Sequence, residues 1–237
     1  MYKLFTTLLT VFTLSCFAQD KVINDKNAQS RAIGNFNAIK VSGAIDVYLS
    51  QGGYEALAVS ASEEKFRDRI KAEVKNGTLT IWYDGDKFTW SSGNKKLKAY
   101  VSFKSIDILS ASGASEFLIS GTLSVPSLQV KLTGASEIKG AVKITDLIAD
   151  LSGASNLKIN GTVVNIKINA DGASDIKGYD LVTDECTASL SGASDINITI
   201  NKVLSAHATG ASSIHYKGAA VVKDLQTSGA SSVSKKS

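Results

Sequence analysis

The sequence has few of the residues that hold small exported proteins together by covalent or metal bonds. Its 237 residues include one proline, Pro126, two cysteines and two histidines. A chain with so few cysteines cannot rest on a disulfide framework, so burial and backbone hydrogen bonds must supply its stability. The net charge is only +4, with both signs interspersed along the chain. Composition therefore argues against a nucleic-acid partner or an anionic membrane surface.

Sequence signatures of catalytic and cofactor sites are absent as well. No HxxxH, GxSxG, GxxxxGK[ST] or strand-linked GxGxxG pattern occurs in the chain. These absences remove the usual zinc, nucleophile-elbow and phosphate-loop chemistries. The sequence therefore predicts no catalytic residue, no cofactor and no metal site.

What the chain has in abundance is glycine in a fixed context. The triplet Gly-Ala-Ser occurs seven times, beginning at Gly113, Gly134, Gly153, Gly172, Gly192, Gly210 and Gly229. Successive copies lie 21, 19, 19, 20, 18 and 19 residues apart, and a period near 20 residues is typical of solenoids. Between the triplets, apolar residues fall two apart, which is the period of a strand. We therefore predict an all-β fold, a parallel β-solenoid with ~19–20-residue coils.

We interpret the triplet as a repeated corner. Adjacent coils of a solenoid lie about 4.8 Å apart, so each coil must turn directly above the last. Glycine adopts the positive φ of a sharp corner without a Cβ penalty. Alanine and serine are small enough to stack on copies of themselves. We expect each serine hydroxyl to donate to a carbonyl or hydroxyl oxygen of the next coil.

The second residue after each triplet serine is large and apolar, which assigns it to the core. This column comprises Phe117, Ile138, Leu157, Ile176, Ile196, Ile214 and Val233. Its neighbours are polar, and residues two apart on a strand, such as Glu137 and Lys139, share the outer face. The acidic column there is interrupted by Asn156 and accompanied by lysines. We interpret it as a solvated face with self-neutralising charges, since calcium would need about six to eight oxygen ligands.

The N-terminal part of the domain, residues 31–105, is less regular than the coils over 106–237. Residues 36–52 are predicted to form a degenerate first coil, in which Ser42-Gly43-Ala44 resembles the corner sequence. Asn76-Gly77 lies between two alternating runs and predicts either a hairpin turn or one more solenoid corner. The hairpin would pair Val74 with Leu79, Ala72 with Ile81 and Ile70 with Tyr83. We expect a helical turn within residues 62–70 and a loop at 84–96 anchored by Trp90.

The first 18 residues predict a secretion signal. Lys3 precedes an apolar core that is too short to span a bilayer, and Cys16 and Ala18 suit the −3 and −1 positions of a cleavage site after Ala18. The alternative is lipid anchoring at Cys16. We expect an exported protein that is periplasmic, outer-surface or secreted, with no transmembrane segment after cleavage. A linker at 19–30 would precede the single domain at 31–237, in which Cys186 is a small buried strand residue.

Three segments together resemble the head GIN domain family, which is described as putative auto-transporter adhesins. They are FNAIKVSGAIDVYLSQG at 36–52, VKNGTLTIWYDG at 74–85 and the repeated SGAS-[DE]-I. The resemblance covers roughly residues 31–233 and implies a right-handed β-helix at the cell surface or in the envelope. Many members of the family have Ser-Gly-Ser-Gly at the corner where this chain has Ser-Gly-Ala-Ser.

These features favour a non-catalytic, adhesin-like binding or structural module of the cell envelope. Its long flat faces suit an extended glycan or another protein surface. Two alternatives stay open. One is a polysaccharide lyase or hydrolase that uses Asp171, Asp175, Asp195 and Lys177 across adjacent coils. The other is an envelope protein that assembles through its solenoid ends.

The C-terminal end of the repeat predicts an open sheet edge. The chain ends with SGASSVSKKS at 228–237, where Lys235 and Lys236 are the only evident charged protection. Open edges pair with other chains unless they are covered or charged. We therefore expect weak self-association at the C-terminal solenoid end.

Overall fold

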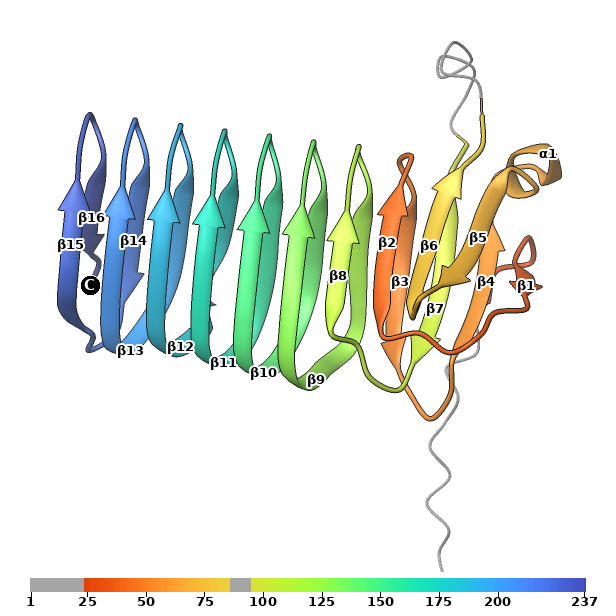
Figure 1. Cartoon of the computed structure of the whole chain (residues 1–237), viewed down its shortest axis with the longest axis horizontal. Coiled ribbons are helices and arrows are strands. Elements are labelled where there is room, and N and C mark those ends of the chain that lie inside the picture. The colour runs from red at the N-terminus through yellow and green to blue at the C-terminus, as the bar shows by residue number, and fades with distance from the viewer. Residues whose placement is uncertain (1–23, 86–94) are drawn as a thin grey trace, which may run out of the picture.

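The computed structural model describes residues 24–85 and 95–237, which form a β-solenoid of about seven turns with coils of about 19 residues (Figure 1). The predicted all-β solenoid is therefore confirmed. The signal segment at 1–18 with Cys16, and Trp90 with the residues around it at 86–94, lie outside the described part. In the described part the one helix is α1, of four residues, and no described helix is long and apolar enough to cross a membrane.

The regular coils consist of five long strands and three shorter ones. They are β9 (Glu116–Leu132), β10 (Glu137–Leu151), β11 (Asn156–Ala170), β12 (Asp175–Leu190), β13 (Asp195–Ala208), β14 (Ser213–Lys217), β15 (Val221–Thr227) and β16 (Ser232–Lys235). Each long strand leaves one corner, bends at the opposite edge of the solenoid and runs into the next corner (Figure 1). We call the segments that run into corners the front sheet and those that leave corners the rear sheet.

The core lies between these two sheets and consists of stacked columns. In the rear sheet, Phe117, Ile138, Leu157, Ile176, Ile196, Ile214 and Val233 follow one another in parallel register. The first six are at most 1% exposed, and Val233, in the last coil, is partly buried. Front-sheet residues such as Ala149, Ile168 and Ala188 form a matching buried column. Alternation along each strand thus buries one face in every coil.

At the corners, the seven triplet glycines all have φ between 71° and 77°. The alanine after each later glycine donates its backbone N–H to the glycine carbonyl of the preceding coil, as Ala154 does to Gly134 at 2.7 Å. A Cβ on Gly153 would lie only 2.6 Å from that Gly134 oxygen. Glycine is therefore required both for the left-handed backbone and for the close approach of successive corners.

The expected role of the triplet serines was wrong in one respect. Ser136, Ser155, Ser174 and Ser194 are buried, and each donates its hydroxyl to the carbonyl three residues earlier in its own coil, at 2.7–3.1 Å. Each of these serines closes its own turn. Coil-to-coil bonds from the hydroxyl also occur, from Ser231 to the Ala208 carbonyl at 2.8 Å and from Ser212 to the Gly192 carbonyl at 3.5 Å.

The N-terminal part departs from simple winding order. Its elements are β1 (Gln29–Arg31), β2 (Ala38–Ser42), β3 (Asp46–Gln51), β4 (Ala56–Ser60), α1 (Glu64–Arg67), β5 (Ile70–Lys75), β6 (Thr78–Tyr83), β7 (Lys98–Phe103) and β8 (Ile108–Ala111). The coil of β2 and β3 pairs with β8 and β9 on one side and with β6 and β7 on the other. The first coil in the sequence is thus the second in the stack.

A hairpin accounts for this inversion. Asn76 and Gly77 both have positive φ, at 49° and 73°, as a two-residue hairpin turn requires. Strands β5 and β6 pair antiparallel in the register expected for the hairpin, with Val74 opposite Leu79. Asn76-Gly77 is therefore a hairpin turn and not a corner. The turn sends the chain back up the front sheet as β6, beside β2.

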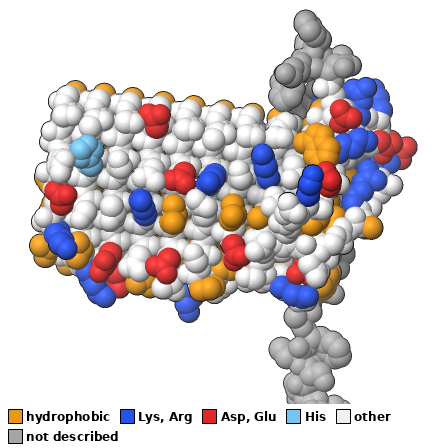
Figure 2. All heavy atoms as spheres, viewed as in Figure 1, with side chains coloured by type: hydrophobic (Ala, Val, Ile, Leu, Met, Phe, Trp, Pro, Cys, Tyr) orange, Lys and Arg blue, Asp and Glu red, His pale blue; other side chains and the backbone are white. Residues whose placement is uncertain are grey.

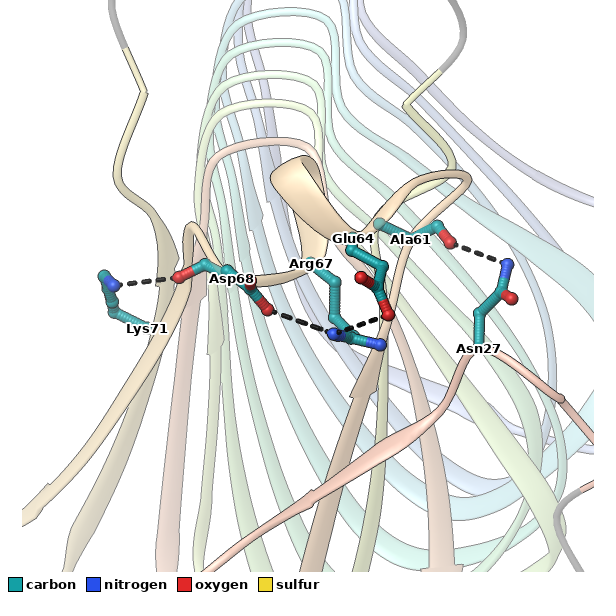
Figure 3. A network of polar contacts seen from close by, with 6 residues as sticks. All are labelled: Asn27, Ala61, Glu64, Arg67, Asp68 and Lys71. Carbon is teal, nitrogen blue, oxygen red and sulfur yellow. Dashed lines mark hydrogen bonds and ion pairs between the residues drawn. The ribbon is translucent and has the colours of Figure 1, made fainter.

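The outer layer at the N-terminal end is a cap with reversed strands. Strands β4 and β5 run antiparallel to β7 and β6, and α1 replaces the corner between them. In this layer Arg67 bonds to the carboxylates of Glu64 and Asp68 around α1, and Asn27 donates to the Ala61 carbonyl at 3.1 Å (Figure 3). Beneath it, Ile70 is only 2% exposed. The core is thereby closed at this end.

A core substitution tests the stacked register. We expect Ile176→Asp to prevent folding, because an unpaired carboxylate in an apolar core costs several kcal/mol against a total stability of about 5–15 kcal/mol. Thr187→Asp places the same group on the same strand at an exposed position and should leave the melting temperature nearly unchanged. Thermal unfolding followed by circular dichroism measures both. An Ile176→Asp protein that melts like the parent would contradict the register.

Three alanine substitutions separate the two demands on the corner glycine. Gly34→Ala has ordinary φ and open space and should be neutral. Gly121 has φ of 78°, but a Cβ there would meet no atom within 4 Å, so Gly121→Ala should cost about 1–2 kcal/mol. Gly153→Ala adds the collision with Gly134 and should cost roughly 3 kcal/mol or more. Urea denaturation gives the three values, and equal costs at positions 121 and 153 would show that the corners are not closely stacked.

Candidate functional site

The front face carries a shallow groove along the solenoid axis. Its volume is about 370 Å³, and it crosses the coils of β9 to β12 just before their corners. The lining side chains are mainly polar and come from two columns, Lys131, Asp150, Asn169 and Ser189 in one and Thr133, Ser152, Asp171 and Ser191 in the other. Figure 2 shows that this face is mostly neither apolar nor charged near the corners, whereas apolar side chains and charges are scattered over its lower half.

Hydrogen bonds between coils hold these polar side chains in place. Asn169 donates to Asp150 at 2.7 Å, and Asn165 makes the equivalent bond to Asp146 at 2.8 Å on the same face. Ser191 donates its hydroxyl to Asp171 at 2.6 Å. The amides of Asn165 and Asn169 and the hydroxyl of Ser191 therefore have a fixed orientation, and each group has further hydrogen-bonding capacity.

The carboxylates of the groove accept hydrogen bonds from their neighbours. The Ser191 hydroxyl and the Gly172 backbone N–H hold the pKa of Asp171 below its usual range. Asp150 accepts from Asn169 and, at 3.4 Å, from Gln129. The groove thus presents fixed acceptors next to amide and hydroxyl donors, which suits a ligand rich in hydroxyl groups.

The rear face is organised differently, because its charges neutralise one another. Lys139 bridges Glu116 and Glu137 at 2.7 Å each, and Lys177 pairs with Asp175 at 2.8 Å. The hydrogen bonds that Lys139 donates to the two glutamates raise its pKa to about 12. Partly exposed pairs of this kind contribute little stability each. The face matches the expected self-neutralising surface.

The four residues of the catalytic alternative do not form one site. Asp175, Asp195 and Lys177 lie on the rear face, where Asp175 pairs in register with Asp195. Asp171 precedes its corner and lines the front groove instead. The corner backbone separates the two groups. Among the residues that the structure describes, no three histidine, cysteine or acidic side chains are grouped so that they could hold a metal ion.

Cys186 lies in the core of β12 and is 1% exposed. Burial raises the pKa of its thiol to about 12. A reactive cysteine needs thiolate character and access to solvent, and Cys186 has neither. It is a small apolar core residue, as expected.

The groove columns were not singled out from the sequence, although the signal is present. They occupy the third and first positions before each triplet glycine, just as the charged columns occupy fixed positions after the serine. A second missed feature is the stacked pair of Tyr48 and Tyr100 on the rear face, with ring centroids 5.1 Å apart. The pairing of β3 with β7 brings these rings together, and sequence spacing does not reveal it.

Comparison with known proteins supports one family and one fold. The sequence profile of the family described as "Putative auto-transporter adhesin, head GIN domain" matches residues 35–220. No functionally curated protein matches the chain.

Several solved structures share the fold at low sequence identity. A "putative adhesin" from Bacteroides fragilis superposes with a TM-score of 0.80 at 22% identity, covering 88% of this chain and 96% of its own. A "putative lipid binding protein" from Parabacteroides distasonis gives 0.68 at 21%, covering 90% and 98%. A "putative adhesin" from Parabacteroides merdae gives 0.61 at 19%, covering 89% and 95%. These similarities show that the architecture is shared.

The inert state of Cys186 can be measured directly. We expect a thiol reagent such as dithionitrobenzoate to leave Cys186 unmodified at pH 8 in the folded protein and to modify it fully in denaturant. The reason is the combination of burial and a raised pKa. A Cys16→Ser background removes the other thiol. Rapid modification of the folded protein would show that Cys186 is accessible and would reopen a redox or nucleophilic role.

Proposed function

This chain belongs to the family described as "Putative auto-transporter adhesin, head GIN domain", and on that premise we propose that it is an exported, non-catalytic binding module that presents its front groove to a glycan. The observation that carries the proposal is the ladder of Asp, Asn, Ser and Thr side chains oriented by coil-to-coil hydrogen bonds. The secretion signal expected at the N-terminus supports export to the envelope or the cell surface.

An extended, uncharged glycan fits the groove better than a compact ligand does. The groove is open and shallow, and its columns repeat at the coil spacing of about 4.8 Å. A chain of linked sugars offers hydroxyl donors and acceptors along its length, so several coils can each bind part of it. No aromatic side chain of the described residues lines the groove, so affinity per sugar would rest on hydrogen bonds. We infer weak binding that depends on ligand length.

Absence of catalysis is the second part of the proposal. The described triplet serines from Ser136 to Ser231 donate to nearby carbonyls, and the acidic residues of the catalytic alternative lie on different faces. General acid–base cleavage needs two groups that flank one bond of the substrate. The groove holds Asp150 and Asp171, and each is engaged by a neighbouring side chain.

An envelope assembly protein is the second candidate function. The observation that favours it is the contrast between the two solenoid ends. The N-terminal end is closed by reversed strands, whereas the C-terminal strand β15 is exposed at all seven residues.

A glycan array followed by affinity measurements tests the binding proposal. The purified protein should bind a subset of uncharged oligosaccharides, with affinity that increases with chain length. Asn169→Ala should lower the affinity about tenfold, since a lost hydrogen bond of roughly 1.4 kcal/mol corresponds to that factor. Asn156→Ala is the matched control, because Asn156 occupies the rear face.

The outcomes separate the candidate functions. Equal losses for both asparagine variants would place the ligand elsewhere, and absence of any glycan binding would overturn the proposal. Shortened oligosaccharides after incubation would establish the lyase or hydrolase alternative in its place.

A further inference from the structure

Among residues 24–85 and 95–237, the last coil of the solenoid has no neighbour on its outer side. Within those ranges, strand β15 pairs only with β13, and β16 pairs only with β14. All other long coils pair on both sides through their backbones. The backbone groups of β15 that point away from β13 therefore form an open parallel-sheet edge of seven residues.

The core columns also end without cover at this coil. Val222 and Leu225 lie in register with Leu204 and Ala206 of the previous coil. The inner pair is 0% and 4% exposed, whereas Val222 is 37% exposed and Leu225 is 49% exposed. Val222 and Leu225 therefore continue the core columns into the last coil, where they are in contact with solvent. Covering them would gain about 25 cal/mol for each Å² of apolar surface removed from water.

The N-terminal end does not offer a complementary surface. Its edge strand β5 carries Lys71, Glu73 and Lys75 at exposed positions. Charges on an edge strand are a common protection against pairing. Contact between the C-terminal end of one copy and the N-terminal end of another would take these charged side chains partly out of water, which is unfavourable. The partner that suits the open end is therefore another open end.

We propose that two copies of this chain associate through their C-terminal ends, with β15 antiparallel to β15 of the second copy about a two-fold axis. The inference rests on the assembly candidate and is independent of glycan binding. Main-chain hydrogen bonds would join the two front sheets, and the exposed ends of the two cores would cover each other. An isologous contact of this kind uses one surface twice and closes on itself.

The side chains select one register for this pairing. Lys223 is the extra residue at an irregularity between β13 and β15, so regular strand geometry runs from Asp224 to Thr227. A two-fold axis at Leu225 sets Leu225 opposite Leu225 and Asp224 opposite Gln226. An axis at Asp224 would instead set two carboxylates opposite each other, and like charges in that position are destabilising. We therefore assign the axis to Leu225.

The irregularity and the lysines near the end limit the strength of the contact. A bulge disrupts the ladder where it occurs, and Lys223, Lys235 and Lys236 add positive charge to both copies. We expect a reversible dimer seen at high protein concentration and favoured by added salt, which screens the lysines.

Sedimentation equilibrium over a wide concentration range tests the association. The unaltered protein should show a monomer–dimer equilibrium. Leu225→Lys should raise the dissociation constant at least tenfold, because it sets two ammonium groups opposite each other without disturbing a buried residue. Ile148→Lys is the matched control, since Ile148 is an apolar side chain of the same sheet that is 39% exposed. Its dissociation constant should equal that of the parent.

Disulfide trapping tests the register. In a Cys16→Ser background, Leu225→Cys should form a symmetric intermolecular disulfide under mild oxidation, and Asp224→Cys should form much less. Three results would each overturn the proposal: a strict monomer for the unaltered protein, equal weakening by Ile148→Lys, or more efficient trapping at position 224 than at 225. Glycan affinity of the Leu225→Lys monomer tests the binding groove separately.

Discussion

The backbone hydrogen bond from each corner alanine to the glycine carbonyl of the preceding coil is the interaction on which the rest of the structure depends. It recurs at 2.7 Å from Ala135 onward through Ala230. The bond fixes the position of each corner along the solenoid axis and its rotation about that axis. The residues that follow therefore start every coil in the same register. This shared register produces the inner column of Phe117 to Val233 and the outer charged columns.

Coil length can vary because the corner, and not the residue count, sets the register. Triplets lie between 18 and 21 residues apart. The pairing irregularities of β9 through β13 all occur between the start of the rear segment and the early front segment, for example between Lys139 and Ala141. Extra or missing residues are thus absorbed at the bend opposite the corner. By the time a strand approaches the next corner, the pairing is regular again.

The shared register of the coils also gives the front and rear faces different side chains. On the rear face, opposite charges stand on adjacent columns and pair within and between coils, as Lys139 does with Glu116 and Glu137. Those side chains satisfy one another. On the front face, the columns before the corner are amides, hydroxyls and single carboxylates, which have more hydrogen-bonding capacity than their neighbours use. The front face is the better candidate for recognition for this reason.

The sequence predicts those features of the structure that one short segment determines. The corners, the core column and the hairpin register at Val74 and Leu79 follow from residue types at fixed spacings, because one short segment determines each. The position of β6 and β7 outside β2 and β3 does not follow, since it is a pairing between distant segments with no repeated residue to mark it. The serine hydroxyls were assigned to the wrong acceptor because two carbonyls lie within their reach, one in the same coil and one in the preceding coil, and residue spacing does not decide between them. The groove columns lie at fixed positions before each triplet, so the sequence could have predicted them. The orientation of their side chains could not be predicted, because it depends on hydrogen bonds between coils such as that from Asn169 to Asp150.

The two ends of the solenoid decide what kind of assembly the fold permits. A stack of identical coils can in principle grow without limit, because every outer coil is a template for the next. In the described part of the chain the N-terminal end is closed by antiparallel strands and by exposed charges on β5, so the proposed pairing uses the C-terminal end. Pairing of two such ends uses both open edges and leaves a closed cap at each outer end. Growth then stops at two copies, because a heterologous contact that could propagate into a fibre has no second surface to use.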